Sequence, residues 1–104
     1  MRYGLNDETV EKICEVLACH TEVERAILYG SRAKGNYRNG SDIDMTLTGG
    51  EDLNRKILYS ITDEIDDLLL PYTFDLSLLK DISDADVVNH IRMFGVVFYE
   101  KTTE

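Results

Sequence analysis

The chain has 104 residues, 43% of them hydrophobic, and a formal net charge of −9 at pH 7, which fits a single globular domain over residues 1–104 rather than a disordered chain. The negative charge argues against nucleic acid as a main partner, because a phosphate backbone binds surfaces with a positive field. No apolar run approaches the ~20 residues of a transmembrane helix, so we expect a cytoplasmic protein without a membrane segment.

The first half of the chain predicts one helix and two strands. Asn6 is a favoured N-cap residue, two acidic residues follow it, and apolar residues then recur at helical spacing to about Cys19. Residues 23–29 form the first predicted strand, which is apolar on both faces, as in a central strand. Residues 42–48 form a second strand that alternates, with hydrophobic side chains on one face and polar side chains on the other.

The next two predicted elements are a helix and a strand on either side of a proline. Apolar residues recur at helical spacing over about residues 53–69, with Leu69 on the apolar face, and Pro71 stops this helix. Residues 72–79 then alternate as a third strand. Its inward side chains are hydrophobic, and Asp75 points outward in the middle of the strand.

The last elements complete the predicted order. Ser83 is the predicted N-cap of a third helix, Gly95 ends that helix, and residues 96–99 form a short strand at the edge of the sheet. The order α-β-β-α-β-α-β predicts an α/β (α+β) fold, in which helices pack on one face of a small mixed β-sheet. The other face of the sheet is expected to carry the acidic residues.

The segment between the first two strands contains residues suited to binding phosphate. Gly30 follows the first strand directly, where the absence of a Cβ lets a ligand approach the backbone. Ser31 stands where a helical turn would begin, so its hydroxyl and the free N–H groups point toward one place. Arg32, Lys34 and Arg38 follow closely. They either balance charge on a loop or form a small positive site for a triphosphate, and their position favours the second interpretation.

Aspartates on two of the predicted strands suggest a metal site. Asp42 and Asp44 are two positions apart, so their side chains leave the same face of a strand, and Asp75 lies on another strand. Such a pair alone is a weak signal, and we interpret a second pair, Asp84 and Asp86, as the acidic first turn of a helix. Solvated carboxylates are the alternative, but aspartate is a poor strand former. Acids on one face also repel one another unless a cation lies between them. The pattern therefore predicts Mg²⁺ carrying a nucleoside triphosphate.

These motifs together resemble a known family. Gly30-Ser31, ten residues, then Asp42-Ile43-Asp44, with Asp75 on a later strand, closely resembles the polymerase-beta-type nucleotidyltransferase superfamily. Within it, the short chain and the run GSRAKG…SDID are similar to the minimal nucleotidyltransferases. These bacterial and archaeal proteins are usually encoded beside a HEPN-domain partner, as antitoxin and toxin. The resemblance covers essentially the whole chain and implies the nucleotidyltransferase fold.

The resemblance implies metal-binding and catalytic roles for three residues. Asp42 and Asp44 would hold two Mg²⁺ ions. Asp75 would complete the catalytic metal site and help to deprotonate the incoming hydroxyl.

The resemblance also implies nucleotide-binding roles. Gly30 and Ser31 would hold the outer phosphates, and Lys34, with Arg32, would neutralise charge on the departing pyrophosphate. Lys34 stands where relatives often carry arginine, which keeps the charge but loses the bidentate fork. The reaction would be attack of a hydroxyl on the α-phosphorus of a nucleoside triphosphate, expected to be ATP, with release of pyrophosphate.

The small size of the chain bears on the acceptor. Little sequence follows the last strand, so one face of the sheet is expected to stay open, although an efficient transferase must exclude water and orient two substrates. We therefore expect a partner protein to complete the site. On the resemblance, the acceptor is a tyrosine or other hydroxyl of a HEPN toxin, and adenylylation neutralises it. The alternative is a non-catalytic binding module that blocks its partner by steric contact. The full set of acids with Gly30-Ser31 favours the enzyme.

Overall fold

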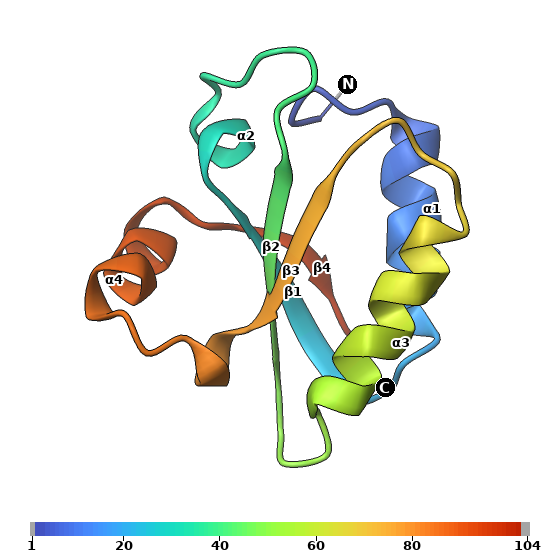
Figure 1. The fold of residues 1–104 in the computed structure, drawn as a ribbon, viewed down its shortest axis with the longest axis vertical. Helices are drawn as coiled ribbons and strands as arrows, with labels where there is room; N and C mark the ends of the chain where they lie inside the picture. The colour runs from blue at the N-terminus through green and yellow to red at the C-terminus, as the bar shows by residue number, and fades with distance from the viewer. Residues whose placement is uncertain (1, 103–104) are drawn as a thin grey trace.

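A four-stranded mixed sheet forms the centre of the computed structural model, which describes residues 2–102 (Figure 1). The strand order is β3-β2-β1-β4. The strands are β1 (Val23–Tyr29), β2 (Ile43–Gly49), β3 (Phe74–Leu78) and β4 (Val96–Glu100). The helices are α1 (Asp7–Ala18), the short α2 (Ser31–Lys34), α3 (Arg55–Asp66) and α4 (Ala85–Phe94), with a 3₁₀ turn at Leu79–Asp81.

The pairing of the strands confirms the predicted mixed sheet. β1 runs antiparallel to both β2 and β4, whereas β2 and β3 are parallel. A parallel pair cannot be joined by a tight turn, and α3 provides the required crossover between β2 and β3. β3 and β4 are the edge strands, as predicted for the last strand.

Alternating side chains of the two central strands build the core. The side chains of Ala26 and Leu28 on β1, and of Ile43, Met45 and Leu47 on β2, are at most 1% exposed. They belong to one cluster with residues of α1 and α3, and both helices lie on the same side of the sheet (Figure 1). The predicted alternation of residues 42–48 is therefore confirmed for its hydrophobic face.

The helix α1 begins where its sequence predicts. The Asn6 side chain accepts a hydrogen bond from the Thr9 N–H at 2.8 Å, which satisfies one free donor of the first turn. For α4 the predicted cap was wrong by one residue: Asp84, and not Ser83, is the N-cap. Its carboxylate accepts a hydrogen bond from the Asp86 N–H at 2.9 Å. The pair Asp84 and Asp86 therefore belongs to a helix start, as we interpreted it.

One helix lies on a different side of the sheet from the prediction. α4 is on the opposite side from α1 and α3 (Figure 1), so the helices do not all share one face. Ile91 of α4 is buried outside the main core cluster. A Cβ added at Gly95 would lie 2.7 Å from Cγ2 of Ile27, whose side chain leaves β1 on the face opposite to Leu28. The periodicity of a helix shows that it has an apolar face but not which face of the sheet it covers.

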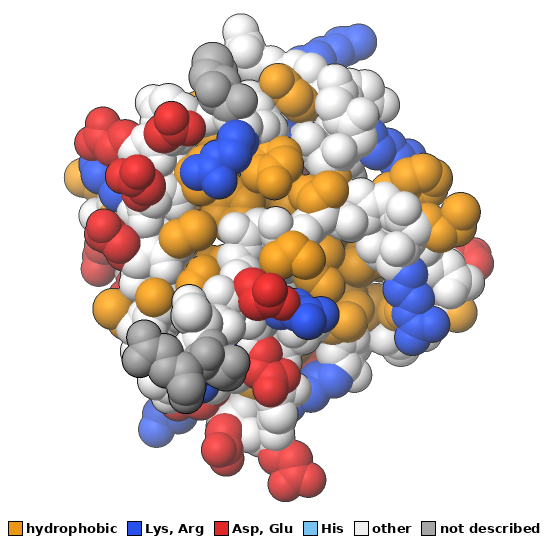
Figure 2. All heavy atoms as spheres, turned by 180° about the vertical axis from the view of Figure 1, so that it is seen from behind, with side chains coloured by type: hydrophobic (Ala, Val, Ile, Leu, Met, Phe, Trp, Pro, Cys, Tyr) orange, Lys and Arg blue, Asp and Glu red, His pale blue; other side chains and the backbone are white. Residues whose placement is uncertain are grey.

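Several large hydrophobic side chains remain exposed. Met93 and Phe94 at the end of α4 and Val97 at the start of β4 lie close together in the sequence, and each is at least 45% exposed. On the side seen in Figure 2, hydrophobic side chains also form a continuous area between acidic and basic ones. Within residues 2–102, none of the helices is both long and apolar enough to span a membrane.

The second long helix is shorter than predicted. α3 ends at Asp66, and Leu69 adopts a positive φ of 54° with 88% of its surface exposed. The expectation that Leu69 belongs to the apolar face of this helix was therefore wrong. Pro71 disfavours helical backbone at the residue before it, so the chain leaves the helix before reaching the proline.

The backbone at Leu69 predicts an unusual order of stability among variants. Left-handed backbone costs an ordinary residue about 1–2 kcal/mol and a β-branched residue more, whereas glycine and asparagine tolerate it. Because Leu69 buries little surface, Leu69→Asn and Leu69→Gly should increase the free energy of unfolding, and Leu69→Val should decrease it. Urea denaturation measures all three. A Val variant as stable as the Asn variant would contradict the assigned backbone conformation.

Candidate active site

The turn after β1 lies directly against one of the predicted catalytic acids. Gly30 has φ 77° and ψ −154°, a backbone conformation that is essentially restricted to glycine. A Cβ at this position would lie 2.6 Å from Oδ2 of Asp44. Ser31 follows as the first residue of α2 and is partly exposed. Gly30 therefore allows the backbone of this turn to approach the Asp44 carboxylate closely.

Strand register places two of the acids side by side. Asp44 pairs with Asp75 across the parallel β2–β3 ladder, and it pairs with Tyr29 across the antiparallel β1–β2 ladder. These residues form one row on the sheet face opposite to the core. Asp42 lies in the loop immediately before β2, and both Asp42 and Asp75 are exposed, whereas Asp44 is partly buried. The structure thus brings the predicted acids together at one end of the sheet.

The charges of these acids oppose one another. Burial raises the pKa of Asp44 above its ordinary value, and the neighbouring carboxylates of Asp75 and Asp42 raise it further. Within residues 2–102, no three His, Cys, Asp or Glu side chains are already arranged to hold a metal ion. The donors are nevertheless carboxylate oxygens, the ligands that Mg²⁺ prefers, and a cation would relieve their mutual repulsion. The residues therefore fit a hard divalent cation in chemistry, while the side chains would still have to converge on it.

Tyr29 is a site residue that our sequence reasoning missed. The pKa of Tyr29 is raised, chiefly by burial and also by the charges of Asp75 and Asp44, while a hydrogen bond with the Ser77 side chain partly offsets the increase. The Tyr29 hydroxyl therefore lies among the polar groups of this face. The Ser77 hydroxyl in turn donates to Thr46 Oγ1 at 3.0 Å. The alternation of side chains along β1 predicts which face of the sheet Tyr29 occupies. Only the register between the strands shows that Tyr29 lies in line with Asp44 and Asp75.

The structure contradicts the predicted role of Arg32. Its side chain is only 3% exposed, and its guanidinium points into the protein. Nη1 donates to the Tyr3 carbonyl oxygen at 2.9 Å, while Nη2 and Nε donate to the Ser41 carbonyl oxygen at 2.9 and 3.1 Å. A group held in this way is not presented to a triphosphate. The sequence motif does not distinguish an exposed arginine from a buried one.

Unlike Arg32, the basic residues Lys34 and Arg38 lie at the surface, and Lys34 is the one at the end of α2. Its side chain is exposed, and its ammonium lies 4.8 Å from the centroid of the Phe94 ring on α4. Such a cation–π contact at an exposed site is weak, about 0.5–1 kcal/mol, so an anionic ligand can compete for the ammonium. Lys34 therefore remains a candidate to contact phosphate.

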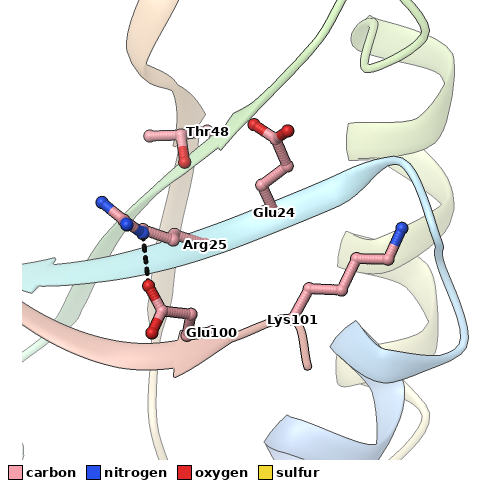
Figure 3. Close-up of a pocket in the computed structure, with 5 residues that line it drawn as sticks. All are labelled: Glu24, Arg25, Thr48, Glu100 and Lys101. Atoms are coloured by element: carbon pink, nitrogen blue, oxygen red, sulfur yellow. Dashed lines mark hydrogen bonds and ion pairs between the residues drawn. The ribbon is translucent and has the colours of Figure 1, made fainter. Parts of the chain in front are cut away.

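A separate pocket lies away from the acids. It has a volume of about 550 Å³ and is lined by Glu24, Arg25, Thr48, Glu100 and Lys101 (Figure 3). Arg25 pairs with Thr48 at the end of β1 and β2 opposite to the pair formed by Tyr29 and Asp44. Arg25 Nε donates to Glu100 Oε2 at 2.6 Å, and both side chains are more than half exposed. The pocket is lined by side chains of opposite charge, and two of them already pair with each other. It therefore offers no catalytic group comparable to the row of Asp44 and Asp75.

Comparison with known proteins identifies the family and the fold of this chain. The family described as Polymerase beta, Nucleotidyltransferase matches residues 11–104. No curated protein sequence matches the chain significantly. Among solved structures, a chain of a toxin–antitoxin complex with AMP-PNP has 17% identity and a TM-score of 0.69, with 94% of this chain and 76% of that chain covered.

Two further solved structures show the same fold. A chain from the complex of a tri-AMPylated Shewanella oneidensis HEPN toxin with MNT antitoxin has 15% identity and a TM-score of 0.68, with 93% of this chain and 74% of that chain covered. A putative nucleotidyltransferase from Sulfolobus solfataricus has 21% identity and a TM-score of 0.53, with 93% and 91% covered.

The contact between Gly30 and Asp44 predicts a specific effect of a methyl group. Gly30→Ala should reduce the free energy of unfolding by more than about 2 kcal/mol, because it adds a steric conflict with the carboxylate to an unfavourable backbone conformation. Gly35→Ala is the control. Gly35 also has a positive φ, of 86°, but an added Cβ there would meet nothing within 4 Å, so the loss should be about 1 kcal/mol. Equal losses in urea denaturation would contradict the close approach at Gly30.

The raised pKa of Asp44, which burial and the neighbouring acids cause, predicts a pH effect in the metal-free protein. The native state keeps the Asp44 proton at a pH where the unfolded state has released it, so the free energy of unfolding should fall as pH rises from near 3.8 to the raised pKa of Asp44. Asp75→Asn should lower the pKa of Asp44, measured by carboxyl NMR titration, and flatten this decrease. Asp84→Asn, at the start of α4, should change neither. An Asp44 pKa unaffected by Asp75→Asn would contradict the coupling.

Proposed function

Because the chain belongs to the polymerase beta nucleotidyltransferase family, we propose that it transfers AMP from ATP to a hydroxyl of a partner HEPN-domain toxin and so acts as an antitoxin. The observation that carries this proposal is the position of the Gly30 turn against Asp44, in one row with Asp75. A phosphate-binding turn beside a pair of carboxylates suits a metal-dependent reaction of a triphosphate.

Asp42, Asp44 and Asp75 would hold the divalent cation, which we propose is Mg²⁺ with two ions in the complete site. When bound, Mg²⁺ would neutralise charge on the phosphates. The support from this chain is its donor chemistry: three neighbouring carboxylates, of which Asp44 has a raised pKa caused partly by the other two. Asp75 and Asp42 are exposed, so both can turn toward a ligand.

The remaining residues would orient the nucleotide and accept a proton. The N–H groups of the Gly30-Ser31 turn would donate to the outer phosphates, and the exposed Lys34 would balance charge on the pyrophosphate. The acceptor hydroxyl oxygen forms a bond to the α-phosphorus as the bond to the bridging oxygen of the β-phosphate breaks. Pyrophosphate leaves, and the hydroxyl proton passes to Asp75, which is exposed at the edge strand where an acceptor can reach it.

A partner protein would supply the acceptor, which we propose is a tyrosine hydroxyl. Asp75 lies on an edge strand and is open to solvent, so a second molecule is needed to exclude water from the reaction. The exposed Met93, Phe94 and Val97 provide apolar surface for such a molecule. The structural neighbours described above include an antitoxin in complex with its AMPylated HEPN toxin, which supports a protein partner of the same kind.

One observation favours a second candidate function, that of an antitoxin acting by steric contact alone. Over residues 2–102, the acidic side chains are not already arranged around a metal position. A binding module would not need that arrangement. The complete set of acids beside Gly30 favours the enzyme, because steric contact has no requirement for it.

Labelled ATP and matched aspartate pairs test the two functions. Protein, Mg²⁺ and ATP labelled at the α-phosphate, added to lysate of the host, should label a discrete protein band that EDTA abolishes. Asp42→Asn with Asp44→Asn should reduce labelling at least 100-fold, a loss of about 3 kcal/mol of transition-state stabilisation. The control is Asp84→Asn with Asp86→Asn, which changes an identically spaced pair at the start of α4 and should leave labelling unchanged.

Protection of cells separates catalysis from steric contact. If the variant with Asp42→Asn and Asp44→Asn still folds and still protects against the toxin, neutralisation by adenylylation is wrong. If it fails to protect while still binding the toxin in a pull-down, the steric mechanism is wrong.

A further inference from the structure

We propose that Arg32 is a positioning residue, whose buried guanidinium fixes the loop carrying Asp42 and thereby sets the position of the Asp42 carboxylate beside Asp44. The inference rests on the proposed function only in treating Asp42 as a metal-binding residue. The role differs from phosphate binding, because Arg32 would act through the backbone at Ser41 and touch no nucleotide.

The first observation is the way in which Arg32 holds Ser41. Two guanidinium nitrogens, Nη2 and Nε, donate to the single carbonyl oxygen of Ser41. That carbonyl belongs to the peptide bond that connects Ser41 to Asp42. On the other side of Asp42, the Ile43 N–H donates to the Thr73 carbonyl oxygen at 2.8 Å. Asp42 itself lies outside β2, so these contacts on either side of it restrain its backbone.

Ser41 also forms two hydrogen bonds with Arg38, within the same loop. The Ser41 N–H donates to the Arg38 carbonyl oxygen at 3.0 Å, and the Arg38 N–H donates to Ser41 Oγ at 2.8 Å. This closed turn restrains the backbone of Ser41 in a loop whose other residues are exposed. Arg32 then connects Ser41 to the interior of the protein.

The second observation is that the start of the chain is shaped to receive the third nitrogen of Arg32. Nη1 donates to the carbonyl oxygen of Tyr3, whose φ of 59° is unusual for a residue with a side chain. Arg2 and Leu5 close this turn with reciprocal backbone hydrogen bonds of 2.9 and 2.8 Å. A Cβ at Gly4 would lie 2.8 Å from Arg32 Nη1. The turn therefore approaches the guanidinium more closely than a side chain at Gly4 would allow.

The third observation is the aromatic surroundings of the guanidinium. Its central carbon lies 5.4 Å from the centroid of the Tyr37 ring and 5.1 Å from that of the Tyr72 ring. Tyr72 immediately precedes Thr73, whose carbonyl oxygen accepts the hydrogen bond from the Ile43 N–H. Arg32 thus connects the loop before β2 with the segment that leads into β3 and Asp75. Only a planar guanidinium offers donors in two directions while its faces contact rings.

The cost of this burial indicates that the arrangement has a purpose beyond general stability. Among the described residues, no carboxylate forms an ion pair with Arg32, so carbonyl oxygens and rings alone compensate the buried charge. A buried cation without an anionic partner is expensive, and an apolar side chain could fill the same space. Holding two carbonyl oxygens in fixed directions is a task that an apolar side chain cannot perform.

Arg32→Lys tests the proposal, with Arg55→Lys as the matched control. Arg55 is an exposed arginine on α3 that pairs with Asp81, far from the loop. Lysine at position 32 keeps the charge but cannot direct two donors to Ser41 and a third to Tyr3. We expect exchange of the hydrogen-bonded amides of Ser41 and Ile43, on either side of Asp42, to become at least tenfold faster, while the core amides of β1 keep their protection.

The enzymatic readout separates positioning from phosphate binding. In Arg32→Lys, the Mg²⁺ concentration for half-maximal activity should rise about 10- to 100-fold, the range typical of residues that orient metal ligands. The KM for ATP at saturating Mg²⁺ should change less than twofold. The opposite result, a raised KM for ATP with unchanged Mg²⁺ dependence and unchanged loop exchange, would overturn the proposal and restore phosphate binding. The control Arg55→Lys should alter neither quantity.

Two precautions keep the result decisive. If Arg32→Lys does not fold, Tyr37→Leu removes one ring from the guanidinium and keeps its hydrogen bonds, and it should show the same exchange pattern in milder form. If the wild-type protein has no transferase activity, the proposed function fails, but loop exchange still tests the contact between Arg32 and Ser41. If activity is present and loop exchange in both variants is unchanged, only the positioning role is wrong.

Discussion

Repulsion among carboxylates held at one end of the sheet is the constraint on which the site depends. Backbone ladders place Asp44 directly beside Asp75, and the loop before β2 adds Asp42. Burial and, after it, the charges of Asp75 and Asp42 raise the pKa of Asp44. The hydrogen bonds of the sheet and the hydrophobic core fix the backbone positions of Asp44 and Asp75, so these two residues stay neighbours in the fold. A divalent cation bound between these carboxylates would relieve their repulsion.

The hydrophobic core and the candidate active site lie on opposite faces of the sheet. One face is covered by α1 and α3 and contains the buried hydrophobic cluster. The other face carries the row of Tyr29, Asp44 and Asp75, and α4 lies on that side. Changes on the second face can therefore alter the site without removing core contacts. The contact between Lys34 and Phe94 also connects α4 to the turn beside the acids.

Local sequence signals predicted most of the fold because each depends on near neighbours in the chain. Alternation placed the hydrophobic residues of β2 correctly, and the N-cap at Asn6 was correct. The errors came where two local signals competed. Ser83 and Asp84 are both good caps, and helical periodicity extended beyond the true end of α3 to Leu69. The face covered by α4 could not be predicted, because amphipathicity carries no information about the partner surface.

The sequence by itself determined the family, whose match covers residues 11–104. It also predicted the candidate site residues, Gly30-Ser31 and the aspartates at 42, 44 and 75, because residue types and their spacing can be read along the chain. The tertiary structure alone decided the directions of the side chains. It turned Arg32 away from the surface toward Ser41, and it aligned Tyr29 with acids on two other strands. The physical reason is that these contacts join residues far apart in the chain. Their geometry follows from strand register and packing, which no short segment of sequence contains.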